Sequence, residues 1–116
     1  MPAVDMPKVV PDVILVCCTH PPDGAEALAT ALVEARLAAC VQVVPGVRST
    51  YRWEGKVESA EESRLDLKTT ADRLPALILM IQQLHPYDLP EIVALPMIGG
   101  SEQYLDWIRE QTRPDS

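Results

Sequence analysis

The segment His85–Glu91 (HPYDLPE) places several reactive side chains within a short stretch of sequence. It carries an imidazole at His85, a phenol at Tyr87 and a carboxylate at Glu91, groups that bind metal ions or transfer protons. Two prolines restrict the backbone and favour extended geometry in the residues that precede them. Such stiffness indicates a segment that holds polar groups in place, although a helix end followed by an edge strand has similar local features.

Two of these groups have a structural alternative as well as a metal-binding one. His85 is either a metal ligand or the residue that ends a helix and donates to a backbone carbonyl. Glu91 opens a strand at a rigid turn and is either a functional carboxylate or the partner of Lys68 or an arginine. His20 precedes two prolines, and we expect it to be an exposed loop residue.

The three cysteines, Cys17, Cys18 and Cys40, do not form a disulfide framework. Their odd number and apolar neighbours predict reduced thiols and a cytoplasmic protein. Cys18 ends an apolar run, where its soft sulfur would suit Cu(I), but a buried core thiol is the alternative. Cys17 and Cys40 are predicted to be core residues.

Length and charge restrict the protein class. A chain of 116 residues predicts one domain, which we place at residues 12–113 after a flexible tail over residues 1–11. A net charge of −7 argues against binding to a phosphate backbone, so no nucleic acid partner is expected. No apolar run approaches the roughly 20 residues of a membrane span, so no membrane partner is expected either.

The hydrophobic pattern predicts an α+β domain. The expected order is β-α-β-β-α-β followed by a C-terminal helix, which is the ferredoxin-like or split βαβ arrangement. Asp23, Asp72 and Ser101 are the predicted helix caps, and Glu26 completes a capping box with Asp23. The expected strands are residues 13–18, 37–53 with a bulge at Pro45–Gly46, 56–69 after a turn at Glu54–Gly55, and 91–97; the expected helices follow Asp23 (with Leu28, Leu32 and Ala35 inward), Asp72 (with Leu74, Leu77, Ile78, Ile81 and Leu84 inward) and Ser101.

The predicted central hairpin is longer than strands of 3–10 residues usually are. A long two-stranded arm is marginally stable alone, so we expect its far end to pack on another subunit. Tyr51, Trp53 and Lys68 lie on this hairpin and, with Tyr87, are candidates for an intersubunit pocket that takes a small anionic ligand. The alternative is interface packing with an extended lysine.

Asp66 lies between Leu65 and Leu67 in a predicted strand. A buried carboxylate without a partner is costly. We therefore expect Asp66 to be exposed or paired with Arg48, Arg52 or Arg64.

Several short motifs occur together in order along the chain. They are Cys18-Thr19, Leu37-Ala38-Ala39-Cys40-Val41, Tyr51-Arg52-Trp53-Glu54-Gly55-Lys56, Lys68-Thr69-Thr70, His85-Pro86-Tyr87, Pro90-Glu91 and Tyr104-Leu105-Asp106-Trp107. With these motifs the chain resembles one known family, the CutA divalent-cation tolerance proteins, over roughly Val13 to Arg109.

The resemblance implies a ferredoxin-like fold in a tight homotrimer whose long hairpins interlock, and a link to copper and other divalent cations. It also implies a copper site made of Cys18, Glu91 and a histidine. At the position of the family's histidine ligand this chain has Leu84, and His85 is the nearest substitute. No organic cofactor is implied.

The leading hypothesis is therefore a non-catalytic, trimeric protein that binds divalent cations, copper in particular. A small-molecule-sensing trimer similar to the PII signalling proteins is the alternative. An acylphosphatase-like enzyme would need an arginine in the loop after the first strand, and Thr19–Gly24 contains none. No Ser-His-Asp or Cys-His nucleophile pattern is present either, so we do not expect an enzyme.

Overall fold

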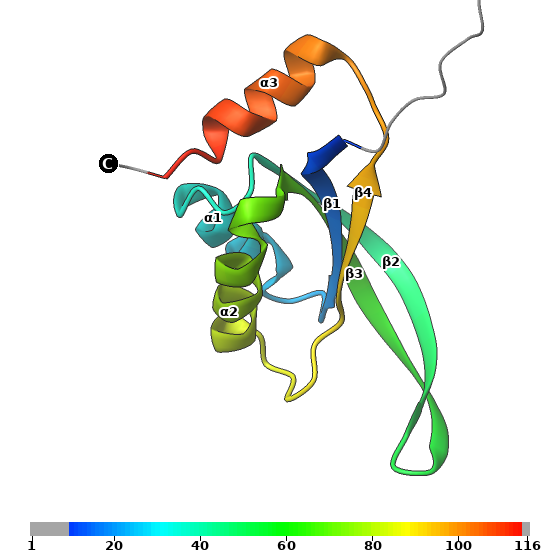
Figure 1. The fold of residues 1–116 in the computed structure, drawn as a ribbon. Coiled ribbons are helices and arrows are strands. Elements are labelled where there is room, and N and C mark those ends of the chain that lie inside the picture. Colours follow the sequence, from blue (N-terminus) through cyan, green and yellow to red (C-terminus); the bar gives the residue numbers. More distant parts are fainter. Residues whose placement is uncertain (1–9, 115–116) are drawn as a thin grey trace, which may run out of the picture.

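The computed structural model describes residues 10–114, which form a four-stranded antiparallel sheet and three α-helices (Figure 1). The strand order is β2-β3-β1-β4. The predicted element order is confirmed. The elements are β1 (Val10–His20), α1 (Ala25–Glu34), β2 (Cys40–Trp53), β3 (Lys56–Thr70), a 3₁₀ turn (Ala71–Arg73), α2 (Leu74–Leu84), β4 (Ile92–Met97) and α3 (Glu102–Gln111).

The predicted tail over residues 1–11 lies mostly outside the described residues, which begin at Val10, the first residue of β1. No helix within residues 10–114 combines the length and the apolar character that a membrane crossing needs.

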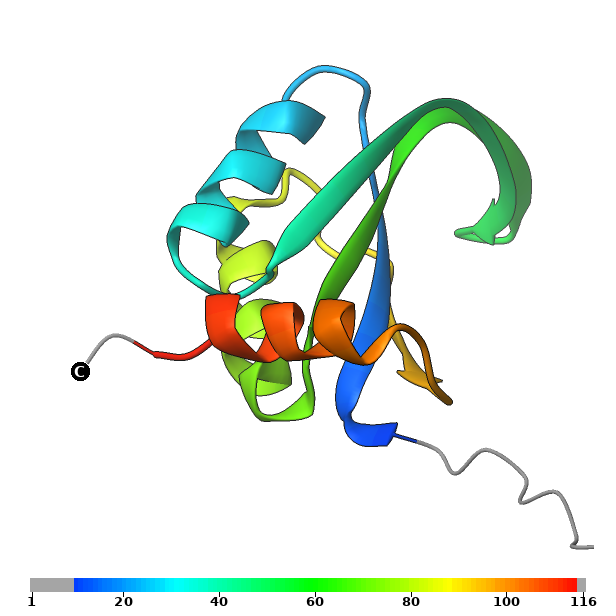
Figure 2. The same ribbon diagram turned by 90° about the horizontal axis from the view of Figure 1, so that it is seen from above.

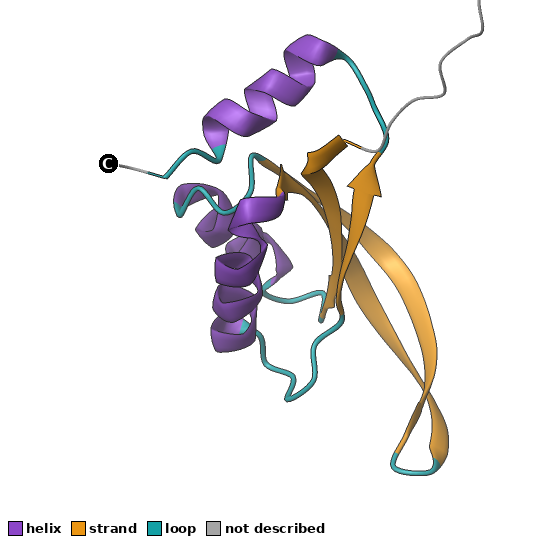
Figure 3. Ribbon diagram, viewed as in Figure 1, coloured by secondary structure: helices purple, strands orange, loops and turns teal. Residues whose placement is uncertain are grey.

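Helices α1 and α2 cover one face of the sheet and enclose the main core (Figures 1 and 3). Alternate residues of a strand point to the same face, so Val16 of β1 meets Leu65 and Leu67 of β3 on the helix side. Leu32 of α1 and Ile81 of α2 close this core, and all five side chains are buried. This face therefore supplies most of the apolar burial that holds the fold together.

Within residues 10–114 the opposite face of the sheet carries no helix, and it combines apolar with charged groups. The register places Cys17 between Asp66 of β3 and Val93 of β4. Val93 and Leu95 are 50% and 46% exposed. The prediction that Cys17 is a core residue is wrong for the single chain, because its side chain points to this face and is only partly buried. Cys40, also predicted as core, is likewise partly buried.

The β2–β3 hairpin projects well beyond the body of the domain (Figures 1 and 2). The pairing register shifts between Val44 and Val47, which confirms the predicted bulge, and Gly46 takes the positive φ of 78° there. At the tip, Glu54 and Gly55 both have positive φ, as a tight hairpin turn requires. Between the bulge and the tip, the side chains of the hairpin are mostly exposed and do not belong to the core under α1 and α2.

The predicted N-caps are correct for one helix of three. The Ser101 hydroxyl accepts a hydrogen bond from the Tyr104 N–H, as expected. The cap of α1 is Gly24 rather than Asp23, because the chain there takes the left-handed φ of 92° that glycine tolerates. Glu26 therefore has no capping-box partner. Asp72 lies inside the 3₁₀ turn and accepts from the Thr70 hydroxyl instead of capping α2.

Three boundary predictions also need correction. β2 begins at Cys40 rather than Leu37. The segment before β2 is held by a 2.7 Å hydrogen bond from the Thr69 hydroxyl to the Leu37 carbonyl oxygen. β4 begins at Ile92, one residue after Glu91. At the helix ends, Ala35 and Leu84 are exposed rather than buried, because Ala35 follows the last residue of α1 and Leu84 is the last residue of α2.

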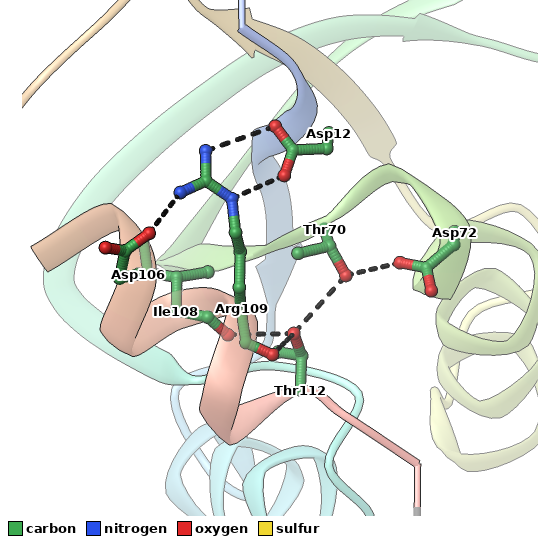
Figure 4. A network of polar contacts seen from close by, with 7 residues as sticks. All are labelled: Asp12, Thr70, Asp72, Asp106, Ile108, Arg109 and Thr112. Carbon is green, nitrogen blue, oxygen red and sulfur yellow. Dashed lines mark hydrogen bonds and ion pairs between the residues drawn. The ribbon is translucent and has the colours of Figure 1, made fainter. Parts of the chain in front are cut away.

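Helix α3 lies across one end of the sheet, as the view from above shows (Figure 2). Leu105 and Ile108 pack with Val13, and Arg109 forms ion pairs with Asp12 of β1 and Asp106 (Figure 4). The hydrogen bond from Arg109 holds the pKa of Asp12 below its usual value. These contacts dock α3 onto the sheet and place its Tyr104 beside β3.

Asp66 behaves as the sequence predicts. Its carboxylate pairs with Arg64 at 3.0 Å and 3.3 Å, and both side chains are partly exposed. The Cys17 thiol donates a weak hydrogen bond to the same carboxylate.

We expect Asp66→Val to change the free energy of unfolding of the single chain by no more than about 1 kcal/mol, because its ion pair with Arg64 is partly exposed there and exposed ion pairs contribute about that much or less. Urea unfolding at a fixed protein concentration measures the change. Leu67→Ala, in the neighbouring buried position, is the control and should cost about 2–5 kcal/mol. An Asp66→Val loss as large as that of Leu67→Ala would contradict the assignment of an exposed pair.

Candidate metal site

The candidate site lies where the loop His85–Glu91 passes the end of β1. The loop connects α2 to β4, and β4 then pairs with β1 so that Ile92 lies opposite Cys18. The two ends of the loop therefore flank the last residues of β1. This topology brings together groups that are far apart in the sequence.

His85 ends α2, as predicted, and its ring is held by two hydrogen bonds. The backbone N–H of Tyr87 donates to Nδ1 at 3.1 Å, so Nδ1 carries no proton. Nε2 therefore carries the proton and donates to the Thr19 carbonyl oxygen at 2.6 Å. Burial lowers the pKa of His85 below its ordinary value, although the bond to Thr19 opposes this effect. The structure thus presents a neutral imidazole with both nitrogens occupied.

Cys18 is a fully buried thiol in the core between the sheet and the helices. Its Sγ lies 3.5 Å from the Thr19 carbonyl oxygen, the same atom that His85 contacts. Burial, and then the negative charges of Glu91 and Glu62, raises the pKa of Cys18 to about 12. The thiol is protonated at neutral pH, and a metal would have to displace that proton.

Glu91 lies just before β4 and is exposed. It directly precedes Ile92, which pairs with Cys18 in the sheet, and its negative charge contributes to raising the pKa of both Cys17 and Cys18. The three predicted ligands therefore gather at one end of the sheet. Across residues 10–114, however, no three His, Cys, Asp or Glu side chains are close enough to hold a metal ion without rearrangement.

Sequence reasoning missed two buried polar residues at this end of the sheet. Glu62 is 5% exposed and accepts a 3.1 Å hydrogen bond from the Tyr87 hydroxyl. Burial, and then this bond, raises the pKa of Tyr87 to about 12. No local signal marks Glu62 as buried, because its covering residue comes 25 positions later.

His20 is also buried, so the prediction of an exposed loop residue is wrong. Its ring meets the edge of the His85 ring at a centroid distance of 4.8 Å. A Cβ at Gly24 would lie 3.1 Å from His20 Cε1. The left-handed glycine at the start of α1 thus also makes room for this histidine.

The four candidates for a ligand pocket do not meet within one chain. Tyr51 pairs with Glu58 near the hairpin tip, whereas Lys68 pairs with Cys40 at the other end of β3. Trp53 is next to the Glu54–Gly55 turn of the hairpin, and Tyr87 lies in the loop between α2 and β4. Lys68 instead approaches the Tyr104 hydroxyl at 3.4 Å and lies over the Tyr104 ring, which stacks on Trp107.

Comparison with known proteins identifies the family. The family model described as "CutA1 divalent ion tolerance protein" matches residues 13–111, nearly all of the described chain. The chain belongs to the CutA1 family. The match spans β1 to the end of α3 and so includes every residue of the candidate site.

Similar CutA proteins occur in distant organisms. The divalent-cation tolerance protein CutA of Thermus thermophilus is 53% identical over 88 residues, which cover 76% of this chain and 85% of that protein. The chloroplastic protein CutA of Arabidopsis thaliana is 42% identical, and the matched part is 91% of this chain but only 58% of the plant protein. The crystal structure of CutA from Xylella fastidiosa is 44% identical, with a TM-score of 0.85 over 88% of this chain and 99% of that one.

Proposed function

We propose that this CutA1 protein is a non-catalytic, cytoplasmic homotrimer of ferredoxin-like subunits that binds divalent cations and copper in particular. Its membership of a divalent-cation tolerance family supports the proposal that it binds divalent cations. The observation that carries the copper assignment is that Cys18 Sγ and His85 Nε2 converge on one atom, the Thr19 carbonyl oxygen. Glu91 precedes Ile92, the residue that pairs with Cys18, and would supply a carboxylate.

The donor set suits copper. A thiolate is a soft ligand that selects Cu(I), and imidazole binds copper well. Binding requires the Cys18 proton to leave and one His85 hydrogen bond to be exchanged for the metal. Because the pKa of Cys18 is raised, copper affinity should increase with pH.

The trimer is supported by surfaces that one chain leaves uncovered. Val93 and Leu95 form an apolar strip on the helix-free face, and Tyr51, Trp53 and Val57 are exposed on the projecting hairpin. Other copies of the chain would bury these groups. Apolar strand surface of this kind otherwise favours uncontrolled association.

One observation favours the alternative of a small-molecule-sensing trimer. Lys68 lies over the ring of Tyr104, which stacks on Trp107, and both aromatic side chains are exposed. A cation beside aromatic faces is a suitable surface for a small planar anion. Under this alternative Lys68→Ala would abolish ligand binding and leave copper affinity unchanged.

Native mass spectrometry during a metal titration tests the main proposal. We expect a species of about 38 kDa, three times the 12.8 kDa chain. Copper should bind in a saturable way, with one ion per chain, and Zn²⁺ should bind more weakly than Cu²⁺. A monomer at micromolar concentration would contradict the assembly, and the absence of saturable copper binding would contradict the function.

A further inference from the structure

The geometry points to His20 as a further ligand of the proposed copper site, acting together with Cys18. The inference rests on the proposed function, because it concerns the same site, and it adds a residue from outside the predicted ligand set. The state of the His20 ring supports it. One ring nitrogen is engaged by the backbone, and the other is left with an unused lone pair.

His20 lies two residues after Cys18 in β1, and both side chains point to the helix side of the sheet. The pairing of β1 with β3 is continuous here, with Cys18 opposite Leu65 and His20 opposite Ser63. Alternate residues of a strand share a face, and Leu65 belongs to the helix-side core. Cys18 and His20 are both buried, at 0% and 5% exposure. The Cys-X-His sequence therefore presents a sulfur and an imidazole on one face, about 7 Å apart at their Cα atoms.

The His20 ring is held in one tautomer. Its Nδ1 lies 2.7 Å from the Pro21 carbonyl oxygen, which can only accept a hydrogen bond, so Nδ1 carries the proton and donates it. Nε2 of the neutral ring is then the unprotonated nitrogen. Histidine ligands in metal sites are arranged in this way, with one nitrogen donating to a carbonyl or carboxylate and the other binding the metal.

Nε2 of His20 is open as well as unprotonated. It has no hydrogen-bond partner among residues 10–114. Within the same residues, every fully buried side-chain nitrogen or oxygen does have a partner. Nε2 therefore touches solvent, although the side chain as a whole is 5% exposed. A nitrogen of this kind can bind an ion without giving up a protein contact.

His85 differs from His20 in this respect. Both of its nitrogens are hydrogen-bonded, so it binds a metal only after giving up a bond such as the one to Thr19. That bond also fixes the carbonyl of the residue that separates Cys18 from His20. The rings of His20 and His85 meet edge-on at a centroid distance of 4.8 Å. His85 thus holds the Cys18–His20 pair in place as long as its own hydrogen bonds are intact.

Two further features support the assignment. Gly24 leaves room for the His20 ring, since a Cβ at this glycine would lie 3.1 Å from the ring atom Cε1. After burial, the negative charges of Glu91 and Glu62 raise the pKa of the Cys18 thiol. Charges that disfavour a thiolate favour a metal cation at the same place.

The Cys18–His20 pair accounts for two ligands of the site. Residues 10–114 contain no group of three His, Cys, Asp or Glu side chains that could hold a metal ion as they stand. The third ligand must therefore come by local rearrangement, either from Glu91 or from His85 after it releases the Thr19 carbonyl.

Nitrogen-15 NMR of the imidazole rings tests the assignment, because the chain has two histidines. In the metal-free protein we expect the Nδ1–H tautomer for His20 and the Nε2–H tautomer for His85. Anaerobic addition of Cu(I), supplied as its acetonitrile complex, should shift the Nε2 resonance of His20 until the site is saturated. An Nε2–H tautomer for His20, or Cu(I) saturation that leaves this resonance in place, would overturn the inference.

His20→Asn removes the binding nitrogen and identifies the His20 resonances in the spectrum. The asparagine amide can still donate to the Pro21 carbonyl in place of Nδ1. We expect Cu(I) affinity, measured by competition with a chelator, to fall by about tenfold or more, since even the outer partners of metal ligands contribute about 10–100-fold. Gln82→Asn, at an exposed position of α2, is the control and should bind with the parent affinity.

This inference and the proposed function fail in different ways. If the parent binds Cu(I) and His20→Asn binds it equally well, His20 is not a ligand, and the site of Cys18, His85 and Glu91 stands without it. If the parent binds no Cu(I), both proposals are wrong. Circular dichroism and urea unfolding show whether His20→Asn keeps the fold. Should it unfold, the shift of the His20 resonance in the parent protein decides alone.

Discussion

Cys18→Ser is expected to abolish Cu(I) binding while the protein remains folded and assembled. The sulfur of Cys18 is the soft ligand of the proposed site, and a serine hydroxyl has little affinity for Cu(I). Serine is close to cysteine in size and can donate to the Thr19 carbonyl that Cys18 Sγ approaches. Competition with a chromophoric chelator under anaerobic conditions measures the affinity.

Cys40→Ser is the matched control for this measurement. Cys40 is partly buried and lies opposite Lys68, at the other end of the sheet from the loop. Its replacement should leave Cu(I) affinity unchanged. If Cys18→Ser keeps the parent affinity, the copper site proposed here is wrong, and only the fold and family remain.

Val93→Asp is expected to convert the trimer into monomers. Val93 lies at the centre of the helix-free face, half exposed and next to Cys17 in the register. In a trimer this face would be buried, and an unpaired carboxylate there would be desolvated at a cost of several kcal/mol. Light scattering coupled to gel filtration should give the mass of one chain instead of three.

Val33→Asp provides the comparison at another partly exposed valine. Val33 lies on the outer side of α1, away from the helix-free face, and is 40% exposed. It should leave the mass of the assembly unchanged. A Val93→Asp protein that stays trimeric would show that the interface uses other surfaces, and circular dichroism of both variants would confirm that each is folded.

The sequence predicted the parts of the fold that depend on local pattern. The buried run of β1, the bulge at Pro45–Gly46 and the turn at Glu54–Gly55 all follow from residue types whose backbone preferences are strong. The prediction that Asp23 caps α1 was wrong. Asp23 is a good cap in isolation, but the chain places a residue with left-handed backbone against His20, and that contact is visible only in the three-dimensional structure.

The candidate site was predictable only in part. Cys18, His85 and Glu91 were named from residue type and family resemblance, and the structure places them at one end of the sheet. The buried state of Glu62 and His20 depends on contacts with residues that come much later in the chain. Hydrophobic pattern cannot reveal such burial, because both residues look like ordinary surface residues in their own segments.

The pairing of β1 with β4 has a consequence for how the protein is made. Strands β2 and β3 are joined by a tight turn and can pair as soon as they are synthesised, since their contacts are local. Cys18 and Ile92 meet only when β4 arrives beside β1, after most of the chain exists. Closing so long a loop is slow and entropically costly. We therefore expect a nascent chain to be unable to capture a metal ion at this site until its last strand has been released from the ribosome.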